Sequence, residues 1–206
     1  RGTPELVYMF DYQDNANPKA NEILDKRGIF YDKHRSIDIT TSVTGTFTTE
    51  GWSVYKYTNV GSDGQPGSNT TFPDTDFPMF RLADVYLMYA EAVARGGQGG
   101  SMAMAVQYIN ALRQRAYGDT AHGVTEAWLT ENNYRNILDE RCRELYWEGT
   151  RRTDLIRYGL FTSANYLWTF KGGVLSGIGV SDRYNVFPIP TTDLSVNANL
   201  KQNEGY

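Results

Sequence analysis

Cysteine, histidine and long apolar runs are scarce in this 206-residue chain, and each shortage excludes a class of structure. With Cys142 as its one cysteine, the chain has no internal disulfide and no cysteine-rich zinc site. Two histidines, His34 and His122, are too few to favour a transition-metal site. No apolar run approaches the roughly 20 residues of a membrane-spanning helix, and the sequence shows neither a start methionine nor a signal peptide.

A basic surface is also missing. The formal net charge is −4 and the isoelectric point is near 5.2. The arginines fall in segments of mixed sign and form no basic stripe, so nucleic acid is not an expected partner. Otherwise the composition is that of a globular protein, with 40% hydrophobic and 21% charged residues. The length allows one substantial core or at most two small domains.

Tyrosine is the residue present in excess, with 15 Tyr beside 9 Phe and 4 Trp. Its ring has a flat apolar face and a polar edge, which suits stacking on sugars and wet interfaces. Tyrosines packed under loops are an equally good explanation, and composition leaves both open.

The most densely specified stretch is 139–157, where charges and bulky apolar residues alternate at helical spacing. Glu140, Glu144 and Glu148 are four residues apart and repel one another unless cations pair with them. The cations expected to do so are Arg141, Arg143, Arg151 and Arg152. These glutamates share their helix with Ile137, Leu138 and Leu145, so the ion pairs are expected beside a core rather than on a solvated face. Gly149 is expected to end the helix in the left-handed conformation.

The spacing of these glutamates also allows a catalytic interpretation. Carboxylates four residues apart on a helix lie about 5–6 Å from one another, close to the 5–5.5 Å or so of a retaining glycosidase. A general acid, however, needs a raised pKa, whereas arginines at this density lower the pKa of Glu140 and Glu144. No catalytic residue is therefore expected.

The same stretch carries a family resemblance. The run E-R-x-R-E-L-x-x-E-G-x-R-x-x-D-L-x-R, from Glu140 to Arg157, resembles the C-terminal signature of the SusD/RagB nutrient-binding lipoproteins of Bacteroidetes. Matching segments lie at 81–92, 109–116, 187–190 and 202–206, with Ala198 and Glu204 standing where the family often has proline. The signature positions, read as structural, are Arg81, Asp84, Glu91, Asn110, Arg113, Glu140, Arg141, Glu144, Glu148, Arg151, Asp154 and Arg157.

The resemblance implies a mainly α fold of tetratricopeptide-like helix pairs with a few short strands and long loops. It implies a single domain, the C-terminal part of a longer protein, with a strand and loop substrate face at 1–76, a helical core at 77–160 and an irregular wrap at 161–206. The export signal and lipid-anchored cysteine would belong to a part of the parent outside this sequence.

The resemblance also implies a function: carbohydrate binding at the outer-membrane surface in polysaccharide utilisation, with glycan uptake through a SusC-like TonB-dependent transporter. Some relatives take peptides, which is the main alternative. A glycoside hydrolase resting on Glu140 and Glu144, and a scaffold that binds only proteins, are the others. The scaffold would bury the aromatic rings of Tyr12 and Trp52.

Periodicity and capping signals divide the helical part. An apolar stripe is expected on a helix from about Pro78, formed by Leu82, Val85, Tyr86, Tyr89, Ala90 and Val93. Ser101 is the expected N-cap of a second helix that ends near Gly118 and packs antiparallel on the first. Thr130 is the expected N-cap of a third helix reaching Glu148, and Thr191 or Thr192 of a last turn.

The N-terminal part is expected to be extended and to supply ligand contacts. Strands are expected at 5–12 and 52–57, with Trp52 and Tyr55 on opposite faces. The candidate ligand-binding residues are Tyr12, Asp14, Asn15, Trp52, Tyr55 and Trp168. Asp14 and Asn15 also fit ordinary turn chemistry.

No cofactor is required by the sequence. Asp63, Asp74 and Asp76 offer the oxygen ligands that calcium prefers, but their spacing matches no EF-hand loop. A calcium ion in this loop is the alternative to having no cofactor.

Overall fold

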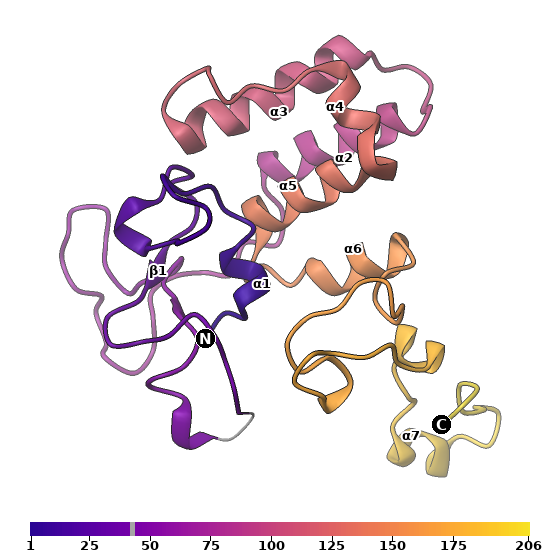
Figure 1. Cartoon of the computed structure of the whole chain (residues 1–206). Helices are drawn as coiled ribbons and strands as arrows, with labels where there is room; N and C mark the ends of the chain where they lie inside the picture. Colours follow the sequence, from indigo (N-terminus) through magenta and orange to yellow (C-terminus); the bar gives the residue numbers. More distant parts are fainter. Residues whose placement is uncertain (42–43) are drawn as a thin grey trace. The chain divides into compact units, whose positions relative to one another are not determined.

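The computed structural model describes residues 1–41 and 44–206, which form two compact units, Arg1–Arg151 and Arg152–Tyr206. Figure 1 shows the N-terminal unit as a loop-rich part followed by a group of helices, and the C-terminal unit as short helices joined by long loops. The expected description, one domain divided at residues 76 and 160, stays a prediction. In the described part of the chain, every helix is too short or too polar to cross a bilayer.

Four helices build the main core of the N-terminal unit: α2 (Leu82–Ala94), α3 (Met102–Tyr117), α4 (Glu126–Thr130) and α5 (Arg135–Leu145). The helices α2 and α3 form an antiparallel hairpin, as expected, and α4 and α5 pack beside it (Figure 1). The fully buried side chains between them are mostly leucine, isoleucine and alanine, and they include Leu87, Ala90, Ala105, Ile109, Leu129 and Ile137. The prediction of a mainly helical fold is confirmed.

The buried face of α2 agrees with the expected stripe in part. Ala90 is buried, and Tyr86, Tyr89 and Val93 pack against the core. Leu82 and Val85 are instead 62% and 50% exposed, and Ala83 and Leu87 are buried in their place. The helix is apolar around much of its circumference, so spacing alone could not choose between neighbouring stripes. The packing turned the buried face towards Ala83 and Leu87, which share a core with residues of α3.

The predicted start and end of α3 are both confirmed. The Ser101 hydroxyl accepts the amide of Met104 at 3.2 Å, and Gly118 ends α3 with φ 86°. Thr130 precedes a 3-10 turn and not the expected helix, and it caps no amide, because its hydroxyl donates to the carbonyl of Ala127. Thr125 caps α4 instead.

The third helix is also interrupted where it was expected to be continuous. A 3-10 turn, η3 (Glu131–Tyr134), separates α4 from α5 and contains left-handed backbone at Asn132 and Asn133. At its other end α5 stops at Leu145, before Glu148. Gly149 has the expected positive φ of 76°, but Trp147 with φ 64° has already broken the helix.

The loop-rich part corrects the first predicted strand. Residues Pro4–Val7 form a short helix, α1, because proline suits the first helical position. Tyr12 then forms an isolated bridge with Ile23. The second predicted strand is shorter than expected, since β2 (Ser53–Val54) pairs antiparallel with β1 (Phe30–Tyr31) and ends there.

A second core lies under these loops and is mainly aromatic. Its buried members are Val7, Phe10, Tyr12, Phe30, Trp52 and Tyr146. Rings in contact here meet mostly edge to face or tilted, as at Phe10 and Tyr146, whose centroids are 5.5 Å apart. Tyr146 follows α5 directly, so this core holds the end of the signature helix against the loops. Two short 3-10 helices, η1 (Ala20–Glu22) and η2 (Thr44–Thr46), also lie in the loop-rich part.

The C-terminal unit contains α6 (Arg151–Arg157) from its second residue on, followed by η4 (Lys171–Gly173), η5 (Asp182–Asn185) and α7 (Thr191–Val196). Its long loop is organised by Lys171, which is 2% exposed. The Lys171 ammonium donates to the carbonyls of Ser163 and Tyr166 at 2.6 and 2.7 Å. The predicted threonine cap of α7 is wrong, because Pro190 occupies the cap position and no side chain caps the helix.

Replacing Ser101 by alanine is expected to lower the free energy of unfolding by about 1 kcal/mol, because an amide of the first turn of α3 loses its partner. Thr130→Ala is the matched control, since that hydroxyl bonds a carbonyl and is expected to change stability by less than about 0.5 kcal/mol. Urea denaturation followed by circular dichroism measures both. Equal losses in the two variants would contradict the capping role of Ser101.

Candidate functional site

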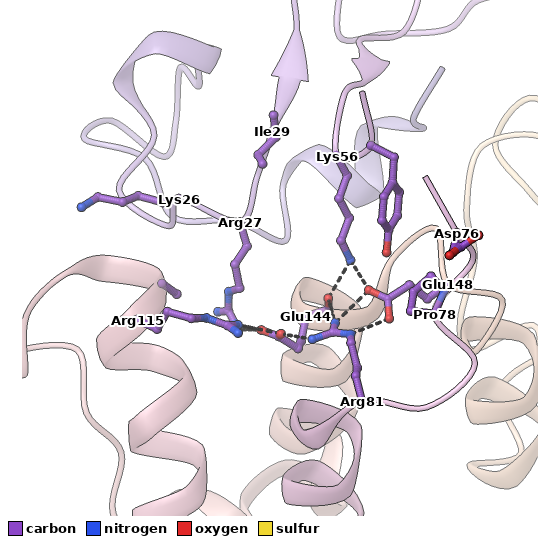
Figure 2. Close-up of a pocket in the computed structure, with 12 residues that line it drawn as sticks. Lys26, Arg27, Ile29, Lys56, Asp76, Pro78, Arg81, Arg115, Glu144 and Glu148 are labelled. Carbon is purple, nitrogen blue, oxygen red and sulfur yellow. Dashed lines mark hydrogen bonds and ion pairs between the residues drawn. The ribbon is translucent and has the colours of Figure 1, made fainter. Parts of the chain in front are cut away.

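A cavity of about 530 Å³ opens where the loop-rich part of the N-terminal unit meets its helices. We call it the charged cavity, because ionic side chains form most of its wall (Figure 2). Arg27 comes from the loop before β1, Lys56 from the segment after β2, and Arg81 from the residue before α2. Arg115 lies on α3, and Glu144 on α5.

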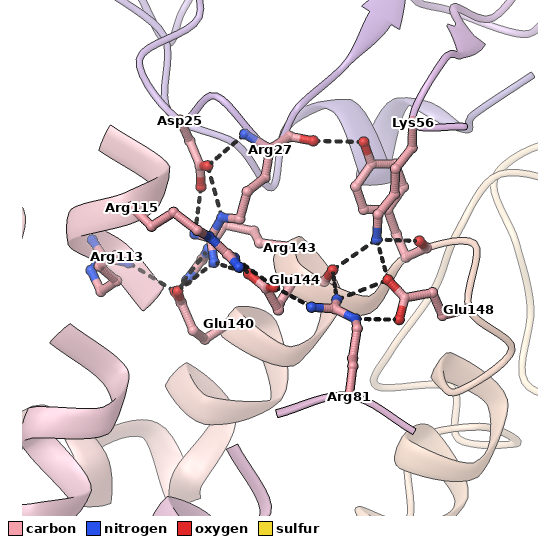
Figure 3. Close-up of polar contacts among 11 residues, drawn as sticks. Asp25, Arg27, Lys56, Arg81, Arg113, Arg115, Glu140, Arg143, Glu144 and Glu148 are labelled. Atoms are coloured by element: carbon pink, nitrogen blue, oxygen red, sulfur yellow. Dashed lines mark hydrogen bonds and ion pairs between the residues drawn. The ribbon is translucent and has the colours of Figure 1, made fainter. Parts of the chain in front are cut away.

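Glu140 is the centre of the ion pairs behind this wall, and it is fully buried. Its carboxylate accepts from Arg27 and Arg113 at 2.8 Å each and from Arg143 at 2.7 Å (Figure 3). Arg27 is held in turn by a bidentate pair with Asp25, at 2.8 and 2.7 Å. Three guanidinium groups therefore share two buried carboxylates.

Glu144 extends the network towards the cavity. It accepts from Arg27 at 3.2 Å, from Arg81 at 2.6 Å and from Arg115 at 2.6 Å. Arg81 joins the next carboxylate as well, since its Nε lies 2.6 Å from Oε2 of Glu148. Each glutamate of the signature is thus bound to the next through a shared arginine (Figures 2 and 3).

Lys56 closes the end of the chain of ion pairs. Its ammonium lies 2.5 Å from the Glu148 carboxylate and donates to the carbonyls of Glu144 and Tyr146 at 2.8 and 3.0 Å. These two carbonyls belong to the end of α5, which has no further helical turn to satisfy them. Lys56 therefore also caps the helix from a distant loop.

The network was predicted, but most of its predicted cations were wrong. Among the four arginines expected to cover the glutamates, Arg143 pairs with Glu140, whereas Arg141 pairs with Asp84 at 2.8 Å. Arg151 lies near Asp139 at 3.7 Å, and Arg152 donates to the carbonyl of Tyr184. Most of the cations come instead from other segments, namely Arg27, Lys56, Arg81, Arg113 and Arg115.

These surroundings lower the pKa values of all three carboxyl groups. Burial alone would raise the pKa of Glu140, but the charges of Arg143, Arg27 and Arg113 outweigh it and hold that pKa far below the ordinary value. The pKa of Glu144 is likewise lowered, because the arginine hydrogen bonds outweigh burial, and so is the pKa of Glu148. A general acid needs the opposite shift.

The other signature residues hold neighbouring segments. The Asn110 amide bonds the backbone of Val124 in both directions, at 2.7 and 3.2 Å. Glu91 pairs with Arg95 at 2.9 Å, and Asp154 with Arg157 at 2.8 Å.

Within the N-terminal unit, the residues expected to contact ligand do not share one surface. Tyr12 and Trp52 are each 3% exposed and lie in the aromatic core, where the Tyr12 hydroxyl donates to the carbonyl of Val7. Trp52 is therefore buried, while Tyr55 is exposed, in agreement with the prediction that the two rings lie on opposite faces. A role for Tyr12 or Trp52 in ligand contact stays a prediction, and their burial argues against it.

Asp14 and Asn15 perform turn chemistry. The Asn15 side chain accepts the amide of Tyr12 at 2.7 Å, and the Asp14 side chain accepts the amide of Ala16 at 3.0 Å. Trp168 belongs to the C-terminal unit, where its ring centre lies 4.5 Å from the Lys171 ammonium.

Asp63 and Asp74, two of the three aspartates considered for calcium, also bond nearby groups of their own loop. Asp74 accepts from the amide and hydroxyl of Ser68, and Asp63 accepts the amide of Gln65. Among residues 1–41 and 44–206, no three acidic, histidine or cysteine side chains lie together as a metal site would require.

A second cavity of about 370 Å³ adjoins the charged one, with Tyr57, Asp76 and Pro78 lining both. Its wall carries three partly exposed aromatic rings, Tyr57, Phe77 and Trp147, and we call it the aromatic cleft. Phe77 and Trp147 are 63% and 59% exposed. Sequence patterns missed both, because neither lies on a periodic strand or helix face.

Trp147 is held in a strained conformation. Its φ of 64° lies in the left-handed region, which a bulky residue rarely adopts and which costs on the order of 1–3 kcal/mol. The residues on both sides are fixed: the Tyr146 hydroxyl donates to the carbonyl of Arg27 at 2.6 Å, and Glu148 is paired with Arg81 and Lys56. The ion-pair network thus stabilises an outward-facing tryptophan beside the cleft.

Comparison with known proteins identifies the family. A sequence model of the SusD family matches residues 8–206. The chain belongs to the SusD family.

Two curated relatives show how much of the chain the family relationship covers. The starch-binding protein SusD of Bacteroides thetaiotaomicron is 47% identical over 159 residues, which are 77% of this chain and 26% of that protein. The SusD-like protein P25 of Formosa agariphila is 36% identical over 138 residues, 62% of this chain and 24% of that protein. The chain therefore spans about a quarter of the length of the curated SusD relatives it matches.

Solved structures agree with the SusD fold. Surface glycan-binding protein A from Bacteroides thetaiotaomicron is 25% identical with a TM-score of 0.56, covering 77% of this chain and 31% of that one. The same protein is known in complex with laminarihexaose, with the same identity and TM-score. A SusD-like protein from Bacteroides fragilis has a TM-score of 0.62 at 20% identity. The match covers 99% of this chain and 46% of the Bacteroides fragilis chain.

Replacing Glu140 by glutamine is expected to lower the free energy of unfolding by about 3–5 kcal/mol, because three buried arginines lose their shared anion. Glu22→Gln is the matched control: it removes a solvent-exposed pair with Lys19 at 3.6 Å, and less than about 1 kcal/mol is expected. Chemical denaturation of both variants makes the measurement. A loss at Glu140 no larger than that at Glu22 would contradict the central place of this carboxylate.

Acid is expected to unfold the protein through the same carboxylates. The pKa values of Glu140, Glu144 and Glu148 are lower in the folded chain than the ordinary 4.5, so the unfolded chain binds more protons. Their contribution is fully present above about pH 5 and is lost as the pH falls further, by up to about 1.4 kcal/mol per pH unit and carboxylate. Urea midpoints at pH 7, 5, 4 and 3 test this. A constant midpoint from pH 5 to pH 3 would refute it.

Proposed function

We propose that the whole protein is a non-catalytic, cell-surface glycan-binding protein that delivers an oligosaccharide to a SusC-like TonB-dependent transporter in the outer membrane. The observation that carries this proposal is the 47% identity to a starch-binding protein across three quarters of the chain. A structural relative known in complex with laminarihexaose supports the same ligand class.

The local geometry supports binding rather than hydrolysis. The three signature glutamates are held ionised by cations, so none is suited to protonate a leaving group. Their carboxylates already accept several charge-assisted hydrogen bonds each. We therefore assign the network to stability and exclude it from the proposed ligand contacts.

We place this chain's contribution to sugar contact at the aromatic cleft. Its rings offer apolar faces for the C–H faces of pyranoses, while polar groups at the rim can bind hydroxyls. Asp76 lines the cleft and forms no hydrogen bond or ion pair with the described residues, so its carboxylate is available to accept sugar hydroxyls. Burial raises the pKa of Tyr57, with a further rise from Glu148, so its hydroxyl stays a donor.

The deciding variant is Trp147→Asn in the intact protein. Asparagine tolerates the left-handed backbone, so the free energy of unfolding is expected to stay within about 1 kcal/mol or to rise. Glycan affinity is expected to fall about tenfold or more, because covering an aromatic face is worth about 1.5–3 kcal/mol. Calorimetric titration with malto- and laminari-oligosaccharides measures the affinity.

Phe72→Ala is the matched control, since this aromatic ring is highly exposed but does not line the cleft. It is expected to leave affinity unchanged. Sugar binding that survives Trp147→Asn would move the contacts away from the cleft. Absence of binding to every saccharide, with binding of short peptides instead, would overturn the glycan proposal in favour of peptide capture.

A further inference from the structure

The C-terminal unit contains a cavity of its own, about 450 Å³ in volume. We call it the arginine pocket. Its lining residues are aromatic, aliphatic or cationic, and no aspartate or glutamate is among those the structure describes there. The aromatic and cationic members are Arg152, Phe161, Trp168, Lys171, Tyr184, Phe187 and Tyr206.

Arg152 is positioned but not neutralised. Its guanidinium carbon lies 4.1 Å from the ring centre of Phe187 and 5.0 Å from that of Phe161. Only Nη2 is bonded to the protein, at 2.7 Å from the carbonyl of Tyr184, and no carboxylate pairs with this side chain among residues 1–41 and 44–206. A guanidinium carries five N–H donors and stays charged, so most of its donors are free for an anion.

Lys171 adds a second positive charge to the wall. Its buried ammonium is held by backbone carbonyls and lies 4.5 Å from the ring centre of Trp168. Carbonyl oxygens solvate this charge without cancelling it. The pocket therefore combines two cations with an absence of lining anions, and its charge complements a negatively charged ligand.

Hydrogen bonds and ring contacts hold the aromatic side chains of the pocket in place. Tyr206 is anchored by its hydroxyl, which lies 3.0 Å from the carbonyl of Val186 and 3.2 Å from that of Arg183. Its ring meets Tyr184 edge to face at 6.5 Å, and Phe161 and Trp168 lie 6.0 Å apart. Fixed aromatic faces select a ligand whose own faces are flat and carry C–H groups.

We propose that the arginine pocket binds a hexuronic acid, a pyranose that carries a carboxylate. The free N–H groups of Arg152, which form a planar fork, donate hydrogen bonds to the carboxylate, and the aromatic side chains cover the sugar ring. The volume suits one or two pyranose units. A neutral hexose would bury the Arg152 charge without an anion, so the carboxylate sets the preference. This site is separate from the aromatic cleft, and each can fail without the other.

The test is titration of the intact protein with galacturonic and glucuronic acid disaccharides and with their neutral hexose counterparts. The uronates are expected to bind at least tenfold more tightly. Arg152→Gln is expected to remove that preference by lowering uronate affinity tenfold or more, since a charge-assisted pair is lost. Lys201→Gln is the matched control: it removes a positive charge from the same unit outside the pocket and is expected to change nothing.

A second variant covers the case in which Arg152→Gln does not fold. Phe187 is 70% exposed, so Phe187→Leu preserves the fold while removing one ring that positions Arg152, and a severalfold loss of uronate affinity is expected. Equal affinity for neutral and acidic sugars, or an equal effect of Lys201→Gln, would overturn the proposal. So would binding of acetate or an acidic dipeptide as tight as that of the uronates. Uronate binding is expected to persist in Trp147→Asn, because that residue lies outside the arginine pocket. This result would support the arginine pocket whatever the outcome for the aromatic cleft.

Discussion

The buried carboxylate of Glu140 is the constraint on which the N-terminal unit depends. A carboxylate without solvent is tolerated only when cations surround it. The three guanidinium groups that do so come from the loop before β1, from α3 and from α5 itself. Satisfying one charge therefore brings three parts of the chain together, and loss of the Glu140 carboxylate would remove the anion that the three guanidinium groups share. Glu144 and Glu148 extend this requirement to the segments after β2 and before α2.

The network also explains the most unusual backbone in the unit. Tyr146 must enter the aromatic core and Glu148 must reach Arg81 and Lys56, so the residue between them has little choice of conformation. Trp147 is consequently held with positive φ and its ring outside the core. Strain that the surroundings enforce in this way is common where a side chain has to be presented to a ligand. The stabilising network and the proposed aromatic cleft are thus two consequences of one arrangement.

Local signals in the sequence were reliable where one residue decides the outcome. Ser101 caps α3 because its hydroxyl reaches an amide three residues on, and Gly118 ends the helix because glycine accepts positive φ. The cap predicted at Thr130 was wrong because Thr125, five residues earlier, caps a helix instead. A threonine by itself does not show which of two neighbouring positions begins the helix. The strand expected at 5–12 failed for a similar reason: β-forming residues there fill an aromatic core from a short helix and turns.

The sequence by itself determined that Glu140, Glu144 and Glu148 needed cationic partners, because helical spacing and charge repulsion are local properties. The resemblance to a SusD-like helical protein came separately, from the run of residues between Glu140 and Arg157. Only the tertiary structure decided which cations pair with these glutamates. Arg27, Lys56, Arg113 and Arg115 are distant in sequence or lie on another helix, and nothing in their local pattern names a partner. The tertiary structure likewise buried Tyr12 and Trp52 and exposed Trp147, since the exposure of an aromatic ring depends on what packs over it.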